Sequence, residues 1–548
     1  MSSAPTRQLN AGPLQAHFET ASGCLRYVRC GDEEVVRGVY VAVRDRNWGT
    51  IEPRIANLVV DQQNTEYGGS FTATFDAECR AEEIDFRWSG RIVGSAGGEI
   101  EYRMQGRAER TFLKNRIGFC VLHPVRECAG QTCRVLLVDG RETEFVFPVS
   151  ISPHQPMRGF AALRHALPSG VEVEIALAGD VFEMEDQRNW TDASYKTYCT
   201  PLELPFPVVV EAGSTIEQRV RITVRDLRRH ATPTRIAADV HSRGERLPSL
   251  RFDGRRLPSL GLCTPDDVPG HSADEVGRLR QLRPGHLRHA VAMTNADWTE
   301  RLRTAHELSE SLQTPLDLAI VLTNDFEAEL ADLAATCQAR PSSIANWLIL
   351  RSGSKASPAT CLEAARRHLR PLAPGARILG GTDAYFAELN RERPDLLLVD
   401  GVCYSINPQV HACDDASLME TLEAQGATVG SAAAFSGGLP IVVGPITLRP
   451  RFNPNATATD GQTQPGELPD SVDPRQRMPF AAAWTVASVG ELAAAGADRL
   501  TYFETIGWRG LMERATGSPL PQKFPSQPGA MFPAYHVLAD IGEFSGAE

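Results

Sequence analysis

Three side chains in the second half of the sequence are suited to proton transfer, and each follows a short apolar run. Glu504 ends the run 499-RLTYFE, Asp383 follows the run 377-RILGG, and His411 lies in the loop after the next run. A carboxylate or imidazole held in a pocket can act as a general base or a general acid. A carboxylate directly after a buried strand has no packing purpose, which favours Glu504. Asp383 could equally cap the segment that follows it.

A second group of side chains on the same loops is suited to binding a small polyhydroxylated molecule. Amide and guanidinium groups recognise the hydroxyl groups of such a ligand through hydrogen bonds, and an aromatic ring packs against its carbon skeleton. We expect Arg449, Asn407, Tyr404 and Tyr385 to bind the ligand in this way. For Tyr404 and Asn407, hydrogen bonds that stabilise the loop are an equal alternative.

The densest polar cluster lies in the first half of the chain, in 182-FEMEDQRNWTDASYKTYCTPL. It also holds three aromatic residues, which a solvated hairpin would not usually carry. We therefore expect this block to lie against a second domain, with Glu185, Arg188 and Asn189 taking part in ligand binding. The alternative is an internally satisfied corner of the first domain.

Motifs for metal-dependent or serine-based hydrolysis are absent from the sequence. His286 and His289 lie three residues apart in an apolar run, so on a strand they would point to opposite faces and could not share an ion. Residue pairs with metal-ligand spacing and the G-x-S-x-G turn of α/β hydrolases do not occur. We expect no metal and no cofactor, although scattered residues could still assemble a metal site.

Side chains so far apart in sequence need a scaffold to bring them together. Over residues 1–228 apolar and polar residues alternate, as in Phe71–Ala77 and Val171–Leu177. Alternation with a period of two indicates antiparallel strands with one buried face. Many such runs, separated by Gly, Pro and Asp, predict a β-sandwich domain. Residues 229–258 are rich in Arg, Pro and Ser and are expected to form a linker.

From residue 259 to residue 548, short apolar runs alternate with amphipathic helical segments. The runs are 259-SLGLC, 287-LRHAVAM, 316-LDLAIVL, 345-ANWLILR, 377-RILGG, 396-LLLVDGV, 440-PIVVGPI and 499-RLTYFE. Eight such cycles predict a (β/α)8 barrel, in which the loops at the carboxyl ends of the strands form the active site. The alternative is a doubly wound open sheet, but no G-x-G-x-x-G turn follows the first run.

The composition is that of a globular protein of the cytoplasm. The chain has 548 residues, a net charge of −12 and 42% hydrophobic residues, enough for two or three domains. The acidic charge argues against a nucleic-acid or acidic-membrane partner, and no apolar run is long enough to span a membrane. The N-terminal residues lack the apolar region of a secretion signal. Twelve irregularly spaced cysteines indicate reduced thiols, and self-association into a homo-oligomer stays open.

Four segments of the sequence are distinctive. They are 182-FEMEDQRNWTDASYKTYCTPLELPFPV, 151-ISPHQP, 115-NRIGFCVLHP and 380-GGTDAYFAELNRERP. These segments resemble the D-apionate lactonase family of bacterial apiose catabolism, and the similarity runs along most of the chain. The resemblance implies an N-terminal β domain, a TIM-type barrel and a C-terminal segment. We expect that last segment to be short here, because the sequence ends at Glu548.

The resemblance further implies a carboxylic-ester hydrolase that converts the sugar-acid lactone D-apionolactone to D-apionate. It supplies no catalytic residues, so the site assignment depends on the loop residues alone. In such a reaction a base deprotonates water, donors such as Arg449, Asn407 and Tyr404 stabilise the oxyanion, and an acid protonates the ring oxygen. Two alternatives stay open. One is a glycoside hydrolase with Asp383 and Glu504 as its carboxylate pair, and the other is a carbohydrate-binding protein without catalysis.

Overall fold

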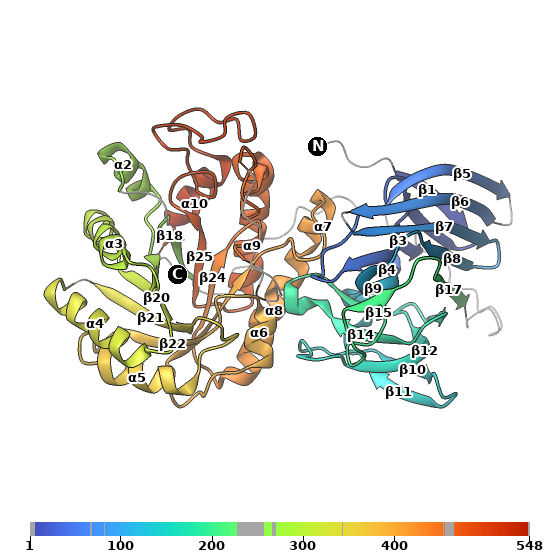
Figure 1. The fold of residues 1–548 in the computed structure, drawn as a ribbon, viewed down its shortest axis with the longest axis horizontal. Helices are drawn as coiled ribbons and strands as arrows, with labels where there is room; N and C mark the ends of the chain where they lie inside the picture. Colours follow the sequence, from blue (N-terminus) through green and yellow to red (C-terminus); the bar gives the residue numbers. More distant parts are fainter. Residues whose placement is uncertain are drawn as a thin grey trace, which may run out of the picture. The chain divides into compact units, whose positions relative to one another are not determined.

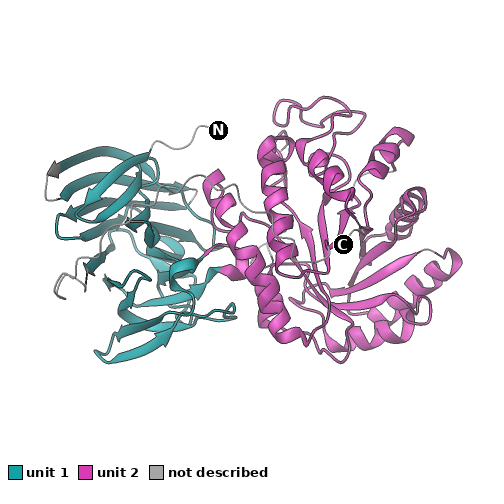
Figure 2. Cartoon of the chain, turned by 180° about the vertical axis from the view of Figure 1, so that it is seen from behind, with its two compact units in different colours: residues 1–187, 194–248 teal, residues 188–193, 249–548 magenta. Residues whose placement is uncertain are grey.

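The computed structural model describes residues 6–65, 68–81, 83–226, 257–265, 270–341, 343–452, 454 and 465–545. The chain divides into two compact units, which Figure 2 shows in different colours. Unit 1 comprises Met1–Gln187 and Ser194–Pro248, and unit 2 comprises Arg188–Ala193 and Ser249–Glu548. The short stretch Arg188–Ala193 therefore groups with unit 2, although it lies within the sequence of unit 1.

Unit 1 is built from antiparallel strands. They are β1 (Thr6–Ala11), β2 (Leu14–Glu19), β3 (Leu25–Cys30), β4 (Glu33–Asp45), β5 (Arg54–Thr65), β6 (Gly68–Ala81), β7 (Ile84–Ser95), β8 (Glu99–Ala108), β9 (Phe112–Pro124), β10 (Thr132–Leu137), β11 (Glu142–Val146), β12 (Met157–Ala166), β13 (Val171–Ala178), β14 (Phe182–Asp186), β15 (Ser194–Cys199), β16 (Val208–Val210) and β17 (Thr215–Asp226). A short helix, α1 (Val125–Cys128), follows β9, and a 3₁₀ turn, η1 (Gln187–Trp190), follows β14.

Hydrogen bonds join these strands into one continuous sheet around a common core. Neighbours run in the order β5–β6–β7–β8–β17–β13–β12 and continue through β14–β15–β9–β4–β3–β2–β1. Burial alternates residue by residue along β6, from Phe71 to Cys79, so one face of the strand is apolar. Side chains from both stretches of the sheet, such as Phe18, Phe86 and Ile175, belong to a single buried cluster.

Unit 2 contains a closed barrel of eight parallel strands (Figure 1). The strands are β18 (Ser259–Cys263), β19 (His286–Ala292), β20 (Leu316–Leu322), β21 (Ile344–Arg351), β22 (Arg377–Gly381), β23 (Gly401–Ile406), β24 (Ile441–Ile446) and β25 (Arg499–Glu504). The helices are α2 (Ala273–Gln281), α3 (Trp298–Leu312), α4 (Phe326–Ala339), α5 (Ala359–Leu369), α6 (Phe386–Arg391), α7 (Asp415–Glu420), α8 (Leu422–Ser436), the 3₁₀ turn η3 (Pro474–Arg477), α9 (Pro479–Ala494) and α10 (Pro533–Gly542). Within the described residues, no helix is long and apolar enough to cross a membrane.

A buried polar network fills the barrel near the start of its strands. Arg499 opens β25, and its Nη1 donates to Asp317 Oδ1 in β20 at 2.9 Å. Asn346 Nδ2 donates to the same oxygen at 2.8 Å. Burial raises the pKa of Asp317 to about 6, although the charge of Arg499 opposes that shift. This network lies at the end of the barrel opposite the carboxyl ends of the strands.

The predicted order of an antiparallel β domain followed by a (β/α)8 barrel is confirmed, and the open-sheet alternative is wrong. One strand was misplaced: the run 396-LLLVDGV was expected to be the sixth strand, but β23 covers Gly401–Ile406. Leu397 is 88% exposed, and Arg370 Nη2 holds the Asp400 carboxylate at 2.7 Å. The first apolar residues of that run therefore belong to the loop before the strand. The predicted linker, residues 229–258, falls outside the described residues except for its last two positions.

Candidate active site

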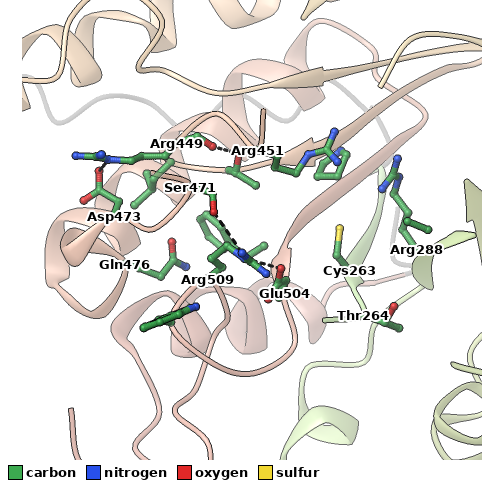
Figure 3. Close-up of a pocket in the computed structure, with 16 residues that line it drawn as sticks. Cys263, Thr264, Arg288, Arg449, Arg451, Ser471, Asp473, Gln476, Glu504 and Arg509 are labelled. Carbon is green, nitrogen blue, oxygen red and sulfur yellow. Dashed lines mark hydrogen bonds and ion pairs between the residues drawn. The ribbon is translucent and has the colours of Figure 1, made fainter. Parts of the chain in front are cut away.

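A pocket lies at the carboxyl ends of β18 and β25, and six of its sixteen lining residues are charged (Figure 3). Its volume is about 60 Å³. The lining residues are Cys263, Thr264, Arg288, Ala290, Pro445, Thr447, Leu448, Arg449, Arg451, Ser471, Asp473, Gln476, Phe503, Glu504, Trp508 and Arg509. Cys263 is in register with Arg288 of β19 and with Glu504 of β25, so these three side chains share one level of the barrel.

Glu504 is the last residue of β25, and a tight turn brings Arg509 back beside it. The Glu504 N–H donates to the Arg509 carbonyl oxygen at 3.0 Å, and Arg509 Nε donates to Glu504 Oε1 at 2.7 Å. Arg509 Nη1 also donates to Ser471 Oγ at 3.2 Å, as Figure 3 shows. The ion pair stabilises the ionised carboxylate. With 15% of its side chain exposed, Glu504 is oriented by its partner yet open to the pocket.

Asp383 lies two residues after β22 and holds two of the arginines that line the pocket. Arg288 Nη2 contacts Asp383 Oδ1, and Arg451 Nη1 donates to Oδ2 at 3.1 Å. Burial of this carboxyl raises its pKa, but the charges of Arg451 and Arg288 outweigh that effect and hold the pKa of Asp383 below its usual value. Asp383 is therefore an ionised anchor for two guanidinium groups and does not itself line the pocket.

Arg449 and Asp473 form another part of the pocket wall (Figure 3). Arg449 Nε lies 3.5 Å from Asp473 Oδ2. The same oxygen accepts hydrogen bonds from Arg475 Nη2 at 2.8 Å and from Gln409 Nε2 at 2.5 Å. Burial raises the pKa of the Asp473 carboxyl, but the hydrogen bonds from Arg475 and Gln409 bring it below its usual value. Asp473 is thus a second ionised carboxylate in the pocket wall.

Two of the predicted site residues, Glu504 and Arg449, line this pocket. The other lining residues were not predicted from the sequence. Those with charged side chains are Arg288, Arg451, Asp473 and Arg509, and Trp508 adds an aromatic ring. The available signals are weak. Arg288 interrupts an apolar strand, which can place a charge inside a barrel, and Trp508 and Arg509 follow the last strand within five residues.

The other binding residues predicted from the barrel loops make hydrogen bonds within the fold and do not line the pocket. The Tyr404 hydroxyl is buried and shares a hydrogen bond of 2.7 Å with Thr428 of α8. The Tyr385 hydroxyl donates to a backbone carbonyl at 3.4 Å, and Asn407 Oδ1 accepts from a backbone N–H at 3.3 Å. For Tyr404 and Asn407 these contacts match the loop-stabilising alternative that the sequence left open.

His411 makes its main contact with the stretch Arg188–Ala193 of unit 2. Its Nδ1 lies 2.7 Å from Asp192 Oδ2, and both side chains are 17% exposed. The ring of Trp190 meets the imidazole edge-on, with 5.4 Å between ring centroids. His411 is thus an oriented imidazole, but it is not one of the residues that line the pocket.

The remaining predicted binding residues come from the polar block of the first half of the chain. Asn189 Oδ1 accepts a hydrogen bond from Asn390 Nδ2 of α6 at 3.1 Å, within unit 2. Arg188, also in unit 2, is only 2% exposed. Glu185 belongs to unit 1, where it pairs with Lys196 at 2.7 Å.

In the described part of the chain, no group of three or more His, Cys, Asp or Glu side chains is arranged to hold a metal ion. All twelve cysteines fall within the described residues, and each is a free thiol. The pocket offers guanidinium and carboxylate groups, a set that can bind a small polar molecule and transfer a proton to or from it.

Both units match models of one protein family. The model described as "D-apionate lactonase, N-terminal domain" matches residues 1–227. The model described as "D-apionate lactonase, TIM barrel domain" matches residues 260–546. A D-apionate lactonase of Brucella anthropi is 33% identical over 520 residues, which are 92% of this chain and 83% of that protein.

The solved structures that match this chain are more distant. A β-arabinopyranosidase is 11% identical, with a TM-score of 0.30, over 80% of this chain and 67% of that one. A β-glucuronidase from Ruminococcus gnavus in complex with D-glucaro 1,5-lactone is 9% identical, with a TM-score of 0.34, over 81% of this chain and 66% of that one. Similarities this low say nothing about the reaction.

Proposed function

This chain belongs to the D-apionate lactonase family, and from that premise we propose that it hydrolyses D-apionolactone to D-apionate in the pocket around Glu504. The family models and the relative span both units, so the protein is a lactone-hydrolysing enzyme, a carboxylic-ester hydrolase. One observation supports the choice of pocket: Glu504 lies at the carboxyl end of a barrel strand, among guanidinium groups. A cytoplasmic setting suits an enzyme of sugar-acid catabolism.

Glu504 serves in this proposal first as base and then as acid. Its carboxylate takes a proton from water while the water oxygen attacks the lactone carbonyl carbon. The carbonyl π electrons move to oxygen and give a tetrahedral oxyanion. The ring C–O bond then breaks, its electron pair goes to the ring oxygen, and Glu504 returns the proton there. The sum is lactone plus water to hydroxy acid, with Glu504 ionised again.

The guanidinium groups supply the donors that the oxyanion needs. Arg449 was predicted for this role from the sequence and lines the pocket, together with Arg288, Arg451 and Arg509. Arg509 also fixes the Glu504 carboxylate through its 2.7 Å ion pair. Donors already in place before the reaction stabilise developing charge without reorganisation, and removing one costs roughly 10²–10³ in turnover.

Asp383 and His411 are the other two groups predicted for proton transfer. In this proposal neither of them transfers the proton. The lowered pKa of Asp383 leaves it unprotonated near neutral pH, so it is a poor acid. His411 is engaged with Asp192 and does not line the pocket. A glycoside hydrolase built on Asp383 and Glu504 would need one of the two protonated. The arginines that pair with Asp383 and with Glu504 favour the ionised form of both carboxylates, which argues against that alternative.

The test is acid release from D-apionolactone, followed in a pH-stat, with wild-type protein and with Glu504→Gln. Glutamine keeps the shape of the side chain but cannot take a proton, so turnover should fall roughly 10²–10⁴-fold. Glu363→Gln, on the exposed face of α5, is the matched control and should retain wild-type turnover.

Aryl glycosides are assayed in the same way, and neither the wild type nor either variant should cleave them. Glycoside cleavage without lactone turnover would overturn the proposed function. Near-wild-type turnover by Glu504→Gln would overturn the role of that residue.

A further inference from the structure

Hydrolysis of a lactone changes the charge of the ligand. The substrate is neutral, whereas the hydroxy acid that leaves is an anion near neutral pH. A pocket with excess positive charge therefore does not treat the two alike, because Coulomb attraction acts on the product and not on the substrate. The balance of charge around the pocket decides which of the two binds more tightly.

The lining of the pocket carries more positive than negative groups. Its cations are Arg288, Arg449, Arg451 and Arg509, and its anions are Asp473 and Glu504. Two further charges touch this set from outside. Asp383 contacts Arg288 and Arg451, and Arg475 contacts Asp473. These two offset each other, so the excess stays positive. Arg475 also forms an ion pair with the exposed carboxylate of Asp415.

Two of these arginines also have N–H groups without an acceptor. Arg288 is 4% exposed, and its Nε has no hydrogen-bond partner. Arg449 Nε is likewise buried and without a hydrogen-bond partner, at 3.5 Å from the nearest Asp473 oxygen. A buried donor left without an acceptor costs free energy. A ligand that brings carboxylate oxygens into this pocket supplies acceptors in the geometry that guanidinium groups recognise.

We propose that this pocket binds the carboxylate of the hydroxy-acid product more tightly than the neutral lactone, so that the product is a competitive inhibitor of the enzyme. The inference rests on the proposed function, because it places product and substrate in the same pocket. The ligand class is the short polyhydroxy monocarboxylate, with D-apionate as the reaction's own member. Attraction between opposite charges also makes this binding weaker at high ionic strength.

The experiment is titration calorimetry of the full chain with sodium D-apionate and with the matching uncharged polyol. We expect the anion to bind roughly tenfold more tightly than the polyol, since a hydrogen bond to a charged group is stronger than one between neutral groups. Arg449→Gln should weaken D-apionate binding roughly tenfold and weaken polyol binding much less, because only the anion loses a charge–charge attraction. Arg303→Gln, in an exposed ion-pair cluster on α3, is the matched control and should bind D-apionate like wild type.

Glu504→Gln gives a second, opposite readout. It removes a negative charge from the pocket and the partner of Arg509, so D-apionate should bind several-fold more tightly than to wild type. In turnover assays, added sodium D-apionate should raise the apparent KM for the lactone and leave kcat unchanged, relative to the same concentration of sodium chloride. Thermal melts of each variant confirm that it is folded.

Equal binding of anion and polyol, or D-apionate binding that Arg449→Gln does not weaken, overturns the inference. Because calorimetry needs no turnover, the two proposals fail separately. Lactone turnover without D-apionate binding refutes the inference alone. D-apionate binding without lactone turnover refutes the proposed function and leaves a carboxylate-binding site.

Discussion

At the scale of single residues, the charge on Asp383 holds the positive side of the pocket in place. The Asp383 side chain is 20% exposed, whereas that of Arg288 is only 5% exposed. Arg288 is therefore the more deeply buried partner, and it depends on Asp383 for its counter-charge. A buried guanidinium that loses its carboxylate is left with an uncompensated charge away from water.

Asp383→Asn should lower the free energy of unfolding by about 3 kcal/mol, near the lower end for breaking a buried pair. Urea denaturation at neutral pH measures this loss.

The contribution of Asp383 to stability also depends on pH. Because the pKa of Asp383 is lowered in the folded protein, its stabilisation is present above the unfolded-state pKa and is lost as the pH falls through the lowered value. Asp192→Asn, in the partly exposed pair with His411, should cost about 1 kcal/mol or less. Equal losses in the two variants would contradict this ranking.

Single residues also show how far the sequence predicts the site. Glu504 and Arg449 could be placed at the pocket because Glu504 ends an apolar run that forms a strand and Arg449 lies three residues after another. Arg288 could not, because an arginine within a strand gives no sign of whether it faces the barrel interior or the helices. Tyr404 lies at the carboxyl end of a strand too, but its hydroxyl bonds to α8 instead. Which way a side chain points depends on barrel closure, and that is not a local property of the sequence.

At the scale of elements, the approach of β22 to β23 has no room for a side chain at Gly381. A Cβ added to Gly381 would lie 2.0 Å from the carbonyl oxygen of Cys403. Gly381 also pairs in register with Cys403, so the two backbones meet at the end of β22. Asp383 follows two residues later, and its position depends on how β22 ends.

Gly381→Ala should force the two strands apart and cost roughly 1–3 kcal/mol or more in stability. The melting temperature should fall, and lactone turnover should fall with it because Asp383 and its arginines move. Gly375→Ala, in the turn before β22, is the matched control, since nothing lies within 4 Å of its added Cβ. A Gly381→Ala protein with the melting temperature of Gly375→Ala would refute this account.

The elements themselves were largely predictable, and the one misplaced strand has a specific cause. The run 396-LLLVDGV has the composition of a buried strand, but Leu397 faces solvent and the strand begins at Gly401. Asp400 accepts hydrogen bonds from Arg370 and from the backbone N–H of Ile378, which fixes the entry into β23. Contacts between residues 22 and 30 positions apart thus set the strand boundary, and apolar composition alone does not reveal them.

At the scale of the whole molecule, buried histidines tie the stability of unit 1 to pH. The His165 side chain is buried, with 4% of the residue exposed. Burial lowers the pKa of His165 from 6.5 to about 4. Burial likewise lowers the pKa of His123 to about 3. Both imidazoles are therefore neutral in the folded protein at pH values where an unfolded chain would bind protons.

The free energy of unfolding should fall as the pH is lowered from about 6.5 to about 4, because protons bind the unfolded chain more readily. At about 1.4 kcal/mol for each unit of pKa, His165 alone accounts for roughly 3 kcal/mol. His165→Leu should reduce this pH dependence, with the contribution of His123 remaining, as chemical denaturation at several pH values would show. His17→Leu, at an exposed position of β2, should not. A pH dependence that survives His165→Leu unchanged would count against this assignment.

The stretch Arg188–Ala193 bears on how such an enzyme can change over evolution. It is encoded between two strands of unit 1, yet it supplies Asp192 to His411 and Asn189 to Asn390 in unit 2. A gene fusion that joined this barrel to a foreign β domain would remove Asp192 and Asn189, and with them one hydrogen bond of His411 and one of Asn390. The sequence from residue 249 onward therefore does not contain all of unit 2. Substitutions at Asn390 or His411 therefore disturb contacts with residues 201 and 219 positions earlier in the chain.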